Sequence, residues 1–419
     1  MKWKRKLTLW VAVLCVITVI TGMVACAPKA NDPKAEQAAH NAEKFTGEQP
    51  DPDEFGVVTA DQWKDIYPYE YASYQENLEN SPDSDKHNYL ELYPALNTLY
   101  AGYGFSKGYD EPASHLYSLE SVTSTPRVNE TTKAGCITCK TPQFTATVNS
   151  QGTDVYNQNF FETVSQYSES ISCYNCHAND PSGFAIGNKF FIDSLGNDVG
   201  KVPVEAQTCG QCHNEYYFPG GVTTNPYTGL DQMTAEAMLA YYDEAGYSDW
   251  TYPDTGTPMV KVQHPEFETI YGGEQNYMAK LGYSCADCHM GTEYAEDGSK
   301  FVSHNWVSPL ENQELLENDC MDCHKDLPGQ VAEWQKQSET RVQSISLKIE
   351  ELVKVMKEQI ASGELTGDKL TQVQKLHRTS QWYWDYVMVE NSEGAHNPTL
   401  STTNLDKAEA AVDEALAML

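Results

Sequence analysis

Five short cysteine pairs constrain this chain more than any other feature of its sequence. Ten of the twelve cysteines fall into pairs in which two residues separate the cysteines, and the remaining two lie near the N-terminus. Four pairs are followed directly by a histidine and one by a lysine. The pairs, each with the residue that follows, are Cys136, Cys139 and Lys140; Cys173, Cys176 and His177; Cys209, Cys212 and His213; Cys285, Cys288 and His289; and Cys320, Cys323 and His324.

A cysteine pair of this spacing followed by a histidine is the attachment signature of a c-type haem. Two thiols bond to one porphyrin, so they must project to one side within a single turn, and the next residue then reaches the iron. Zinc is the alternative, because cysteine pairs of the same spacing also build zinc sites. Zinc sites do not need a histidine directly after the second cysteine, and the leader described below indicates export. We therefore predict five covalently bound c-type haems.

The first pair departs from the other four, because Lys140 stands where they have histidine. Taken alone, the pair is compatible with a degenerate haem site. Beside four intact motifs it indicates a changed iron ligand. An amine binds iron only when neutral, so desolvation and the charge of the metal must lower the pKa of this lysine. We expect this haem to keep one axial position open for a substrate, while the other four carry electrons with two strong axial ligands each.

The N-terminus predicts export. Basic residues precede an apolar run from Leu7 to about Ile20, and small residues then lead to Cys26. This order is typical of a signal peptide, here residues 1–25, although an uncleaved anchor stays open. The segment before Cys26 resembles a bacterial lipobox, with Met23 where leucine is usual. We expect an extracytoplasmic protein that is anchored to the outer face of the cytoplasmic membrane through lipid on Cys26 or through the leader.

The chain is strongly acidic, with a formal net charge of −32. Such a surface repels nucleic acid and favours solubility. A redox partner would therefore need a basic or neutral docking face. Arginine is scarce, so each arginine is a candidate for a specific role; the four are Arg5, Arg127, Arg341 and Arg378.

Composition divides the chain into four parts. Residues 26–60 are polar and predict a flexible tether. Residues 61–327 are rich in Tyr, Gly, Asn and Pro, and they predict a haem-binding and catalytic body whose core is formed by the cofactors. Residues 328–419, in the same domain, carry apolar residues at helical spacing and predict helices over about 331–361, 369–389 and 405–418. The C-terminal region either buttresses the haem core or also forms a dimer interface.

The predicted fold class is mainly α: a multihaem cytochrome c with short helices and loops around five haems and long C-terminal helices. One lysine-type motif followed by four histidine-type motifs resembles the ammonia-forming cytochrome c nitrite reductases. Five other segments are similar to that family, namely residues 122–127, 214–218, 261–265, 381–385 and 396–398. The resemblance covers roughly residues 61–400. It implies the six-electron reduction of nitrite to ammonium.

The resemblance also assigns the catalytic haem. It implies that Lys140 is the proximal ligand and that Arg127, Tyr216 and His264 line the open face. These residue types suit the chemistry, because Arg127 and His264 can place positive charge and hydrogen bonds on the oxygens of a small anion. His264 can pass protons in the useful pH range, and the hydroxyl of Tyr216 can donate a proton or a hydrogen atom.

Further ligands follow from the same resemblance. It implies a calcium ion held by the side chains of Glu215 and Gln263 and by the main-chain carbonyls of Tyr216 and Lys261. Oxygen donors of this kind suit a hard cation. It also implies three distal haem ligands, for the second, third and fourth haems in turn: His304, His115 and His396. The implied partners are nitrite, a membrane-bound quinol-oxidising cytochrome c as electron donor, and a second copy of the chain in a homodimer.

Two alternatives stay open from the sequence. The chain could be an electron-transfer protein without a substrate of its own, in which case the first haem would have both axial positions filled. It could also reduce hydroxylamine, nitric oxide or sulfite, because the same open haem could accept each of them.

The distal ligand of the fifth haem departs from the family pattern. A histidine is usual seven residues before the first cysteine of the fourth motif, and Met278 occupies that position. Between His264 and His289 the sequence has no other histidine. Because a thioether is a known axial partner of histidine and raises the haem potential, we predict ligation by His324 and Met278. Packing of Met278 on a porphyrin is the alternative, and a ligand would then come from His40, His87 or His377, or the haem would be five-coordinate.

Overall fold

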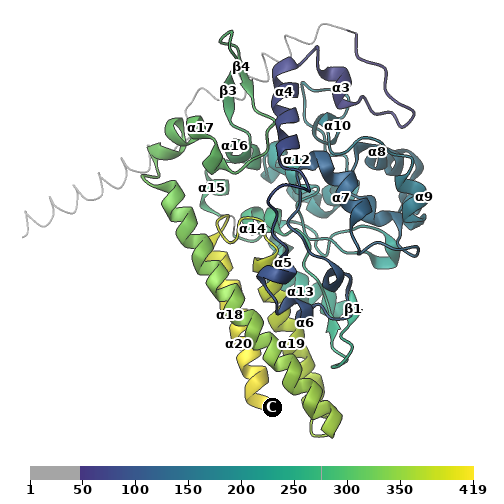
Figure 1. Cartoon of the computed structure of the whole chain (residues 1–419), viewed down its shortest axis with the longest axis vertical. Coiled ribbons are helices and arrows are strands. Elements are labelled where there is room, and N and C mark those ends of the chain that lie inside the picture. Colours follow the sequence, from purple (N-terminus) through teal and green to yellow (C-terminus); the bar gives the residue numbers. More distant parts are fainter. Residues whose placement is uncertain (1–47, 275) are drawn as a thin grey trace, which may run out of the picture.

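The computed structural model describes residues 48–274 and 276–419, and it is mainly helical (Figure 1). The predicted signal peptide, Cys15, Cys26, His40 and most of the predicted tether lie outside the described residues. Among the described residues, no helix is both long enough and apolar enough to span a bilayer. The chain forms a body of short elements, from which a long helical hairpin extends to the C-terminus (Figure 1).

The body is built from short helices joined by turns and loops. Its first half contains α3 (Ala60–Trp63), α4 (Pro68–Glu76), α5 (Tyr89–Leu92), α6 (Leu96–Leu99), α7 (Ser118–Ser124), α8 (Pro142–Gln151), α9 (Phe160–Val164) and α10 (Cys173–His177). Its second half contains α11 (Lys189–Leu195), α12 (Val204–Gly210), α13 (Ala235–Glu244), α14 (Glu266–Tyr271), α15 (Tyr277–Lys280), α16 (Cys285–His289) and α17 (Gln313–Asn318).

Strands are few and short in the described residues. The antiparallel pair β1 (Trp250–Thr251) and β2 (Pro258–Met259) places Trp250 opposite Met259. The second antiparallel pair, β3 (Thr292–Tyr294) and β4 (Lys300–Val302), places Thr292 opposite Val302. Neither pair forms part of a larger sheet. The body is therefore held together by the packing of side chains between short elements and not by a sheet.

The C-terminal hairpin consists of α18 (Leu327–Ser362), α19 (Gly367–Met388) and α20 (Pro398–Met418), which pack along one another (Figure 1). The buried face of α18 carries apolar residues at helical spacing, among them Val342, Ile345, Ile349 and Leu352. Gly363 ends α18 with a left-handed backbone conformation, φ 81°, which glycine adopts without a steric penalty. The indole of Trp384 in α19 donates a hydrogen bond of 2.8 Å to the carbonyl of Val342 and joins two of these helices.

The long helices were predicted correctly, but two boundaries were wrong. The third helix begins at Pro398 rather than near 405, because Asn397 caps it and proline suits the first turn, where an amide hydrogen has no helical partner. The first begins at Leu327 for the same reason, since Pro328 stands in its first turn. The predicted tether also ends too late, because Val57 and Val58 are completely buried in the body.

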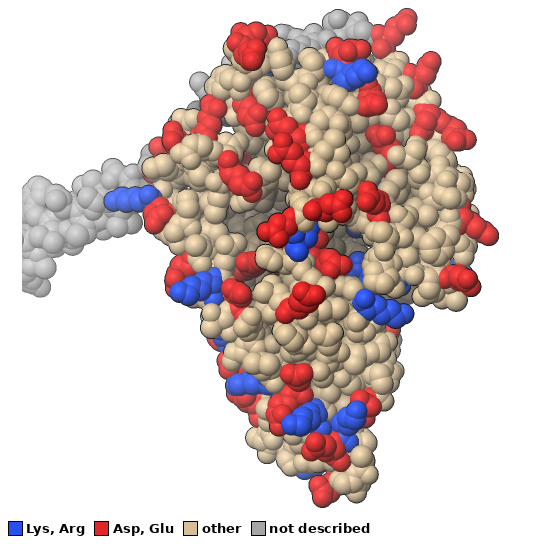
Figure 2. Space-filling view, in the orientation of Figure 1, with Lys and Arg blue, Asp and Glu red and all other residues tan. Residues whose placement is uncertain are grey.

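One hydrophobic core joins the body and the hairpin. It includes Tyr100 and Tyr242 from the body and Val353, Trp382 and Val412 from the hairpin, all of them buried. The hairpin therefore buttresses the body directly, and side chains of α19 reach the interior that surrounds the candidate site. The visible face carries many scattered acidic side chains and a hollow near its centre (Figure 2).

Candidate active site

The cysteine motifs form single turns of helix, as thioether attachment requires. The second and fourth motifs are the short helices α10 and α16. Each begins with a capping box, in which Ser172 pairs with Asn175 and Ser284 pairs with Asp287. Such reciprocal caps satisfy amide groups that a very short helix leaves without partners. The third motif closes α12, and the fifth begins a 3₁₀ turn at Cys320.

The first motif has a different backbone. It begins in a 3₁₀ turn, Ala134–Ile137, and Cys139 has a φ of 63°, in the left-handed region that non-glycine residues seldom adopt. Strain of this kind often marks a functional site. The hydroxyl of Ser118 donates a hydrogen bond of 2.7 Å to the carbonyl of Lys140. The turn and this contact hold Lys140 in a conformation that the histidine motifs do not share.

The motifs are neighbours in the interior. The amide group of Asn188 donates to the sulfur of Cys139 at 3.4 Å and to the sulfur of Cys212 at 3.5 Å, so the first and third motifs adjoin. The thiol of Cys209 raises the pKa of Cys285 by hydrogen bonding, so the third and fourth motifs adjoin as well. Cofactors attached at these motifs would therefore form a continuous series.

Three motif histidines each face a histidine from a distant part of the chain. The ring centroids are 6.3 Å apart for His177 and His304, 6.0 Å for His213 and His115, and 6.0 Å for His289 and His396. Two imidazoles that bind one metal from opposite sides, through bonds of about 2 Å, would have centroids roughly 6 Å apart. The three pairs are those that the family resemblance implied, and their spacing fits a haem iron between the two rings.

The environment of four of these six rings also suits metal binding, whereas hydrogen bonding and charge from Glu266 and Glu390 raise the pKa of the other two, His213 and His396. Burial lowers the pKa of His115 to about 3 and of His177 to about 4. The neutral imidazole, which is the form that binds a metal, therefore prevails at neutral pH. His304 and His289 have lowered pKa values for the same reason.

Lys140 lies in a desolvated pocket. Burial lowers its pKa, and the positive charge of Arg127 lowers it further, while the thiols of Cys139, Cys212 and Cys136 act in the opposite direction. The expected fall in the pKa of this lysine is confirmed. A lysine with a lowered pKa next to the two cysteine thiols of its motif is a donor set that fits a haem bound through nitrogen.

Arg127, Tyr216 and His264 surround the same motif. The charge of Arg127 acts on the pKa of Cys136, Lys140 and Tyr216, so the guanidinium lies within electrostatic reach of all three. Its carbon Cζ lies 4.3 Å from the centre of the Phe105 ring, which fixes the side chain by a cation–π contact. Burial raises the pKa of the Tyr216 phenol, so this group keeps its proton.

His264 is half-buried, and its imidazole is neutral at neutral pH. Burial lowers its pKa to about 4, although Glu266 opposes the shift. Its Nδ1 atom is buried and has no hydrogen-bond partner among the described residues. The ring lies 6.0 Å from that of His213, and His213, His264 and Glu266 form a compact group. An unpartnered ring nitrogen beside the first and third motifs can donate to, or accept from, a small bound molecule.

The predicted calcium ligands come together beside His264. Glu215 is completely buried, and its carboxylate accepts hydrogen bonds from the hydroxyl of Tyr242 at 2.9 Å and from the amide of Gln263 at 2.6 Å. The side-chain amide of Gln263 donates to the carbonyl of Lys261 at 3.2 Å. Burial raises the pKa of Glu215 strongly, so a nearby cation would stabilise its carboxylate form. These oxygens fit a hard cation such as calcium.

The fifth motif lies close to the surface, and His324 is only partly buried. Nδ1 of His324 contacts Oε1 of Gln330 at 3.0 Å. Met278 lies in α15, and the amide of Tyr283 donates to its carbonyl at 3.1 Å. Burial and then the charge of Asp319 raise the pKa of Tyr283, which also senses Cys288 and Cys320. The α15 turn therefore lies near the fourth and fifth motifs.

The alternative histidines for the fifth haem lie in other surroundings. His377 is completely buried in α19, where its Nδ1 contacts the hydroxyl of Thr257 at 3.1 Å. His87 is exposed, and its amide donates to Glu111 at 3.1 Å. His377 is therefore part of the packing between α19 and the body.

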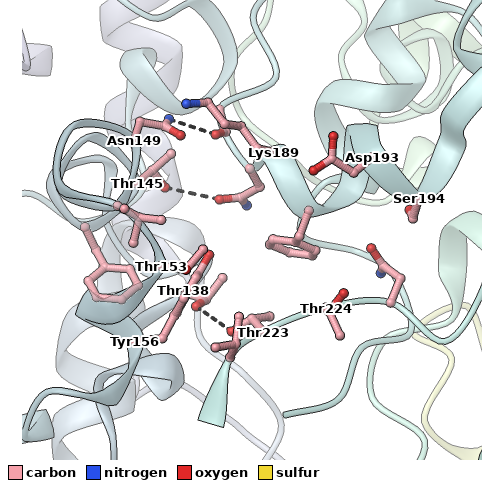
Figure 3. Close-up of a pocket in the computed structure, with 18 of the residues that line it drawn as sticks. Thr138, Thr145, Asn149, Thr153, Tyr156, Lys189, Asp193, Ser194, Thr223 and Thr224 are labelled. Atoms are coloured by element: carbon pink, nitrogen blue, oxygen red, sulfur yellow. Dashed lines mark hydrogen bonds between the residues drawn. The ribbon is translucent and has the colours of Figure 1, made fainter. Parts of the chain in front are cut away.

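A separate pocket of about 580 Å³ lies behind the first motif (Figure 3). Thr138 of that motif lines it, and the hydroxyls of Thr138 and Thr223 lie 3.0 Å apart (Figure 3). The lining combines threonine and asparagine side chains with apolar and aromatic ones, and Lys189 and Asp193 are its charged members. Arg127, Tyr216 and His264 do not line this pocket, so it is distinct from the predicted substrate face.

Sequence reasoning missed several buried acids around the site. Asp385 of α19 contacts the segment that carries the predicted calcium ligands, since its carboxylate accepts the amide of Val262 at 2.9 Å and lies 3.2 Å from Nζ of Lys261. Glu390 and Glu266 contact imidazoles of two histidine pairs. The similarity of residues 381–385 to the family was the one signal for Asp385, and no local pattern marks Glu266 or Glu390.

Known proteins match this chain over most of its length. The family profile described as Cytochrome c552 matches residues 59–419. The cytochrome c nitrite reductase subunit NrfA of Nitratidesulfovibrio vulgaris is 31% identical over 402 residues, covering 83% of this chain and 75% of the relative. A cytochrome c-552 of Aliarcobacter butzleri is 30% identical and covers 83% of this chain and 74% of the relative.

A solved structure agrees with these matches. The catalytic subunit of the cytochrome c nitrite reductase from Desulfovibrio desulfuricans, described with two calcium sites, has a TM-score of 0.78 and 26% sequence identity. The match covers 87% of this chain and 86% of that chain. The mainly α multihaem architecture predicted from the sequence is thereby confirmed.

Proposed function

Because the chain belongs to the cytochrome c552 family of nitrite reductases and is an oxidoreductase, we propose that it reduces nitrite to ammonium at a haem bound through Lys140. One observation carries the proposal. The single lysine motif lies in a desolvated pocket within electrostatic reach of Arg127, with His264 close by. Nitrite, six electrons and eight protons give ammonium and two water molecules, so the site must bind an anion and supply protons repeatedly.

The first step is anion binding. A haem held by Cys136, Cys139 and Lys140 would supply an iron that can bind a small anion and the electrons for its reduction. Arg127 carries a permanent positive charge in a partly desolvated setting, where a charge-assisted hydrogen bond is stronger than in water. It would hold the oxygens of nitrite and stabilise the negative charge that develops on them as N–O bonds weaken.

Proton supply falls to the other two residues. His264 is neutral at the pH of the medium because burial lowers its pKa, so its imidazole can take up and release a proton without remaining charged. Tyr216 keeps its phenolic proton because burial raises its pKa. The phenol can therefore donate a hydrogen bond to the anion. It can also donate its proton to the nitrite oxygens, which leave as water.

The cation site would support these groups. Calcium held by Glu215, Gln263 and the carbonyls of Tyr216 and Lys261 would fix the main chain of Tyr216 and the segments that immediately precede Tyr216 and His264. Its charge would also favour anions in a very acidic protein. We propose this role because the two ligand segments, residues 215–216 and 261–263, already lie in contact.

Electrons would reach the first haem from the other four. The first motif adjoins the third and the third adjoins the fourth, so the fourth and third haems would lead to the first. We propose bis-histidine ligation of the second, third and fourth haems by the three observed histidine pairs. We propose ligation of the fifth haem by His324 and Met278. A weak near-infrared charge-transfer band in the oxidised protein, lost in Met278→Ala, would support that last assignment, and its absence from the parent protein would overturn it.

Membership of a cytochrome c family implies an extracytoplasmic location. We propose further that lipid on Cys26 or the leader attaches the protein to the membrane. There a membrane-bound quinol-oxidising cytochrome c would donate electrons, and its docking face would be basic or neutral to suit the acidic surface of this protein (Figure 2). We also propose a homodimer through the hairpin, where Leu347 of α18 is largely exposed. Sedimentation of the holoprotein tests this, and a monomer at micromolar concentration would contradict it.

The decisive experiment measures the product. The purified holoprotein is supplied with a reduced viologen and nitrite, and we expect ammonium in a ratio of one to six viologens oxidised. Lys140→His should keep the haem covalently bound and depress ammonium formation strongly. Lys133→His, at an exposed lysine of the same segment, is the matched control and should behave as the parent.

The outcomes separate the alternatives. Viologen oxidation without ammonium would overturn the proposed reaction. A ferric spectrum in which all five haems are six-coordinate and low-spin would favour an electron-transfer protein. Parallel assays with hydroxylamine, nitric oxide and sulfite rank the other substrates. Unchanged ammonium formation in Lys140→His would show that lysine ligation is incidental.

A further inference from the structure

The imidazoles of the histidine pairs differ in what their outer nitrogen contacts. Nδ1 of His177 contacts the carbonyl of Gly183 at 2.6 Å, that of His304 the carbonyl of Val302 at 2.9 Å, and that of His289 the carbonyl of Val307 at 2.9 Å. These partners are neutral. Nδ1 of His396 instead contacts a carboxylate, Oε1 of Glu390, at 2.5 Å.

The loop between α19 and α20 builds this contact. Glu390 follows the end of α19 and is only 3% exposed. The hydroxyl of Ser392 donates to its other oxygen, Oε2, at 2.5 Å, and the amide of His396 donates to the oxygen of Ser392 at 2.8 Å. The carboxylate is thus held on one side by the loop and offers its remaining oxygen to the imidazole. Glu390 is therefore a buried carboxylate that hydrogen bonds hold in one orientation, and it is not a surface contact.

A weaker version occurs at the third haem site. Nδ1 of His213 lies 3.6 Å from Oε2 of Glu266. The other oxygen of Glu266 accepts the amide of Asn391 at 3.1 Å. One loop therefore supplies the acid at the fourth haem site, Glu390, and contacts the acid at the third, Glu266, through the amide of Asn391. The second haem site has carbonyl partners on both of its histidines.

We propose that Glu390 sets the reduction potential of the fourth haem by hydrogen bonding to its distal ligand His396. A carboxylate that accepts the Nδ1–H of a ligating imidazole makes the other nitrogen a stronger donor to the metal. A stronger donor stabilises ferric over ferrous iron, so the potential falls. Glu390 acts through His396 and is a positioning residue. This inference rests on the proposed haem ligation and not on nitrite as the substrate.

The consequence concerns the direction of electron flow. A fourth haem with a more negative potential gives a larger driving force for transfer through the third haem to the first. It also returns electrons less readily from the catalytic haem to the donor side. The loop that joins α19 to α20 would thereby let the helical hairpin influence the reduction potential of the fourth haem, and with it the driving force for electron transfer.

The test is a redox titration of the holoprotein without substrate, followed by optical and electron paramagnetic resonance spectra. In Glu390→Gln we expect one low-spin component to move to a more positive potential, while the other components stay in place. All four histidine-ligated haems should remain six-coordinate. The matched control is Glu393→Gln, which removes a charge from an exposed acid in the same loop and leaves the imidazole contact intact. It should leave every potential unchanged.

Two results would overturn the proposal. One is a Glu390→Gln protein in which no component moves, and the other is an equal shift in Glu393→Gln, which would indicate a general charge effect. If Glu390→Gln releases His396 and a new high-spin signal appears, Glu390→Asp provides the measurement. It keeps the charge but retracts the carboxylate, and the same component should move in the same direction by less. Because no substrate is present, failure here leaves the ammonium assay unaffected, and the reverse also holds.

Discussion

Asp385 of α19 is the clearest point at which the helical hairpin controls the candidate site. Its carboxylate accepts hydrogen bonds from the hydroxyl of Tyr100 and, at 2.9 Å, from the amide of Val262, and it lies 3.2 Å from Nζ of Lys261. Both ion-pair partners are almost fully buried. Nζ of Lys261 also donates to the carbonyl of Val262 at 2.6 Å. The pair therefore clamps the segment that leads to Gln263 and His264.

The magnitude follows from burial. Burial lowers the pKa of Lys261 and raises that of Asp385, and their mutual attraction opposes both shifts. Removing one partner of such a pair leaves an uncompensated buried charge and costs about 3–5 kcal/mol. For Asp385→Leu we expect a loss of this size. With an unfolding entropy of about 2.1 cal/mol/K per residue, the Tm should fall by roughly 4–6 °C.

The double variant Asp385→Leu/Lys261→Met should be more stable than Asp385→Leu alone. An apolar pair of similar volume often replaces a buried ion pair at little cost. The amide of Val262 would remain without its acceptor, however, which costs about 1–3 kcal/mol. The side chain of Lys261 is not a predicted calcium ligand, so its replacement leaves the main-chain carbonyl in place.

The assay combines stability with calcium retention. Thermal unfolding at a fixed scan rate, followed by circular dichroism, compares the parent, the two single variants and the double variant. Calcium remaining after dialysis against a chelator is measured by elemental analysis, and we expect less in Asp385→Leu. Trp384→Phe, which loses the hydrogen bond to Val342 on the same helix, should retain calcium as the parent does. Asp385→Leu with parental stability, or strictly additive effects in the double variant, would refute the reasoning.

Three further predictions concern single residues. Arg127→Ala should raise KM and lower kcat together, reducing kcat/KM about 10- to 150-fold for the loss of a charge-assisted contact worth about 1.5–3 kcal/mol. Arg341→Ala, which breaks surface ion pairs with Asp406 and Glu409 and a hydrogen bond to the carbonyl of Thr402, should leave the kinetics unchanged, and equal kinetics for both variants would contradict the role of Arg127. Glu215→Ala should lose the cation and lower activity more than stability; native protein without calcium by elemental analysis would exclude the site. Burial lowers the pKa of His377 to about 4, below the unfolded value of about 6.5, so the unfolded state binds the proton first as the pH falls. The stability contribution is complete above pH 6.5 and is lost between pH 6.5 and 4, by about 3 kcal/mol; in His377→Gln this part of the pH dependence should disappear from denaturant titrations, and an unchanged slope would show that His377 is not its source.

The sequence predicted those features whose chemistry is local. Two thiols and an iron ligand must lie within one turn of chain, so each haem motif is complete in five residues, as at Cys173 to His177. The long helices were predictable for a similar reason, because a buried face repeats every three or four residues, as from Val342 to Met356. The boundaries at Leu327 and Pro398 were missed because apolar periodicity starts after the first turn, whereas the prolines in these first turns mark where the helices begin.

Contacts between distant segments required the tertiary structure. His115 meets His213, and His304 meets His177, across long stretches of chain, and resemblance to a family rather than any periodicity pointed to these partners. Nothing local marked Glu390 as a partner of His396 or Asp385 as a partner of Lys261. The sequence alone predicts a motif when covalent geometry limits how far apart its residues can lie along the chain. A pairing between elements forms only when the packing of the whole chain repays the entropy of bringing them together.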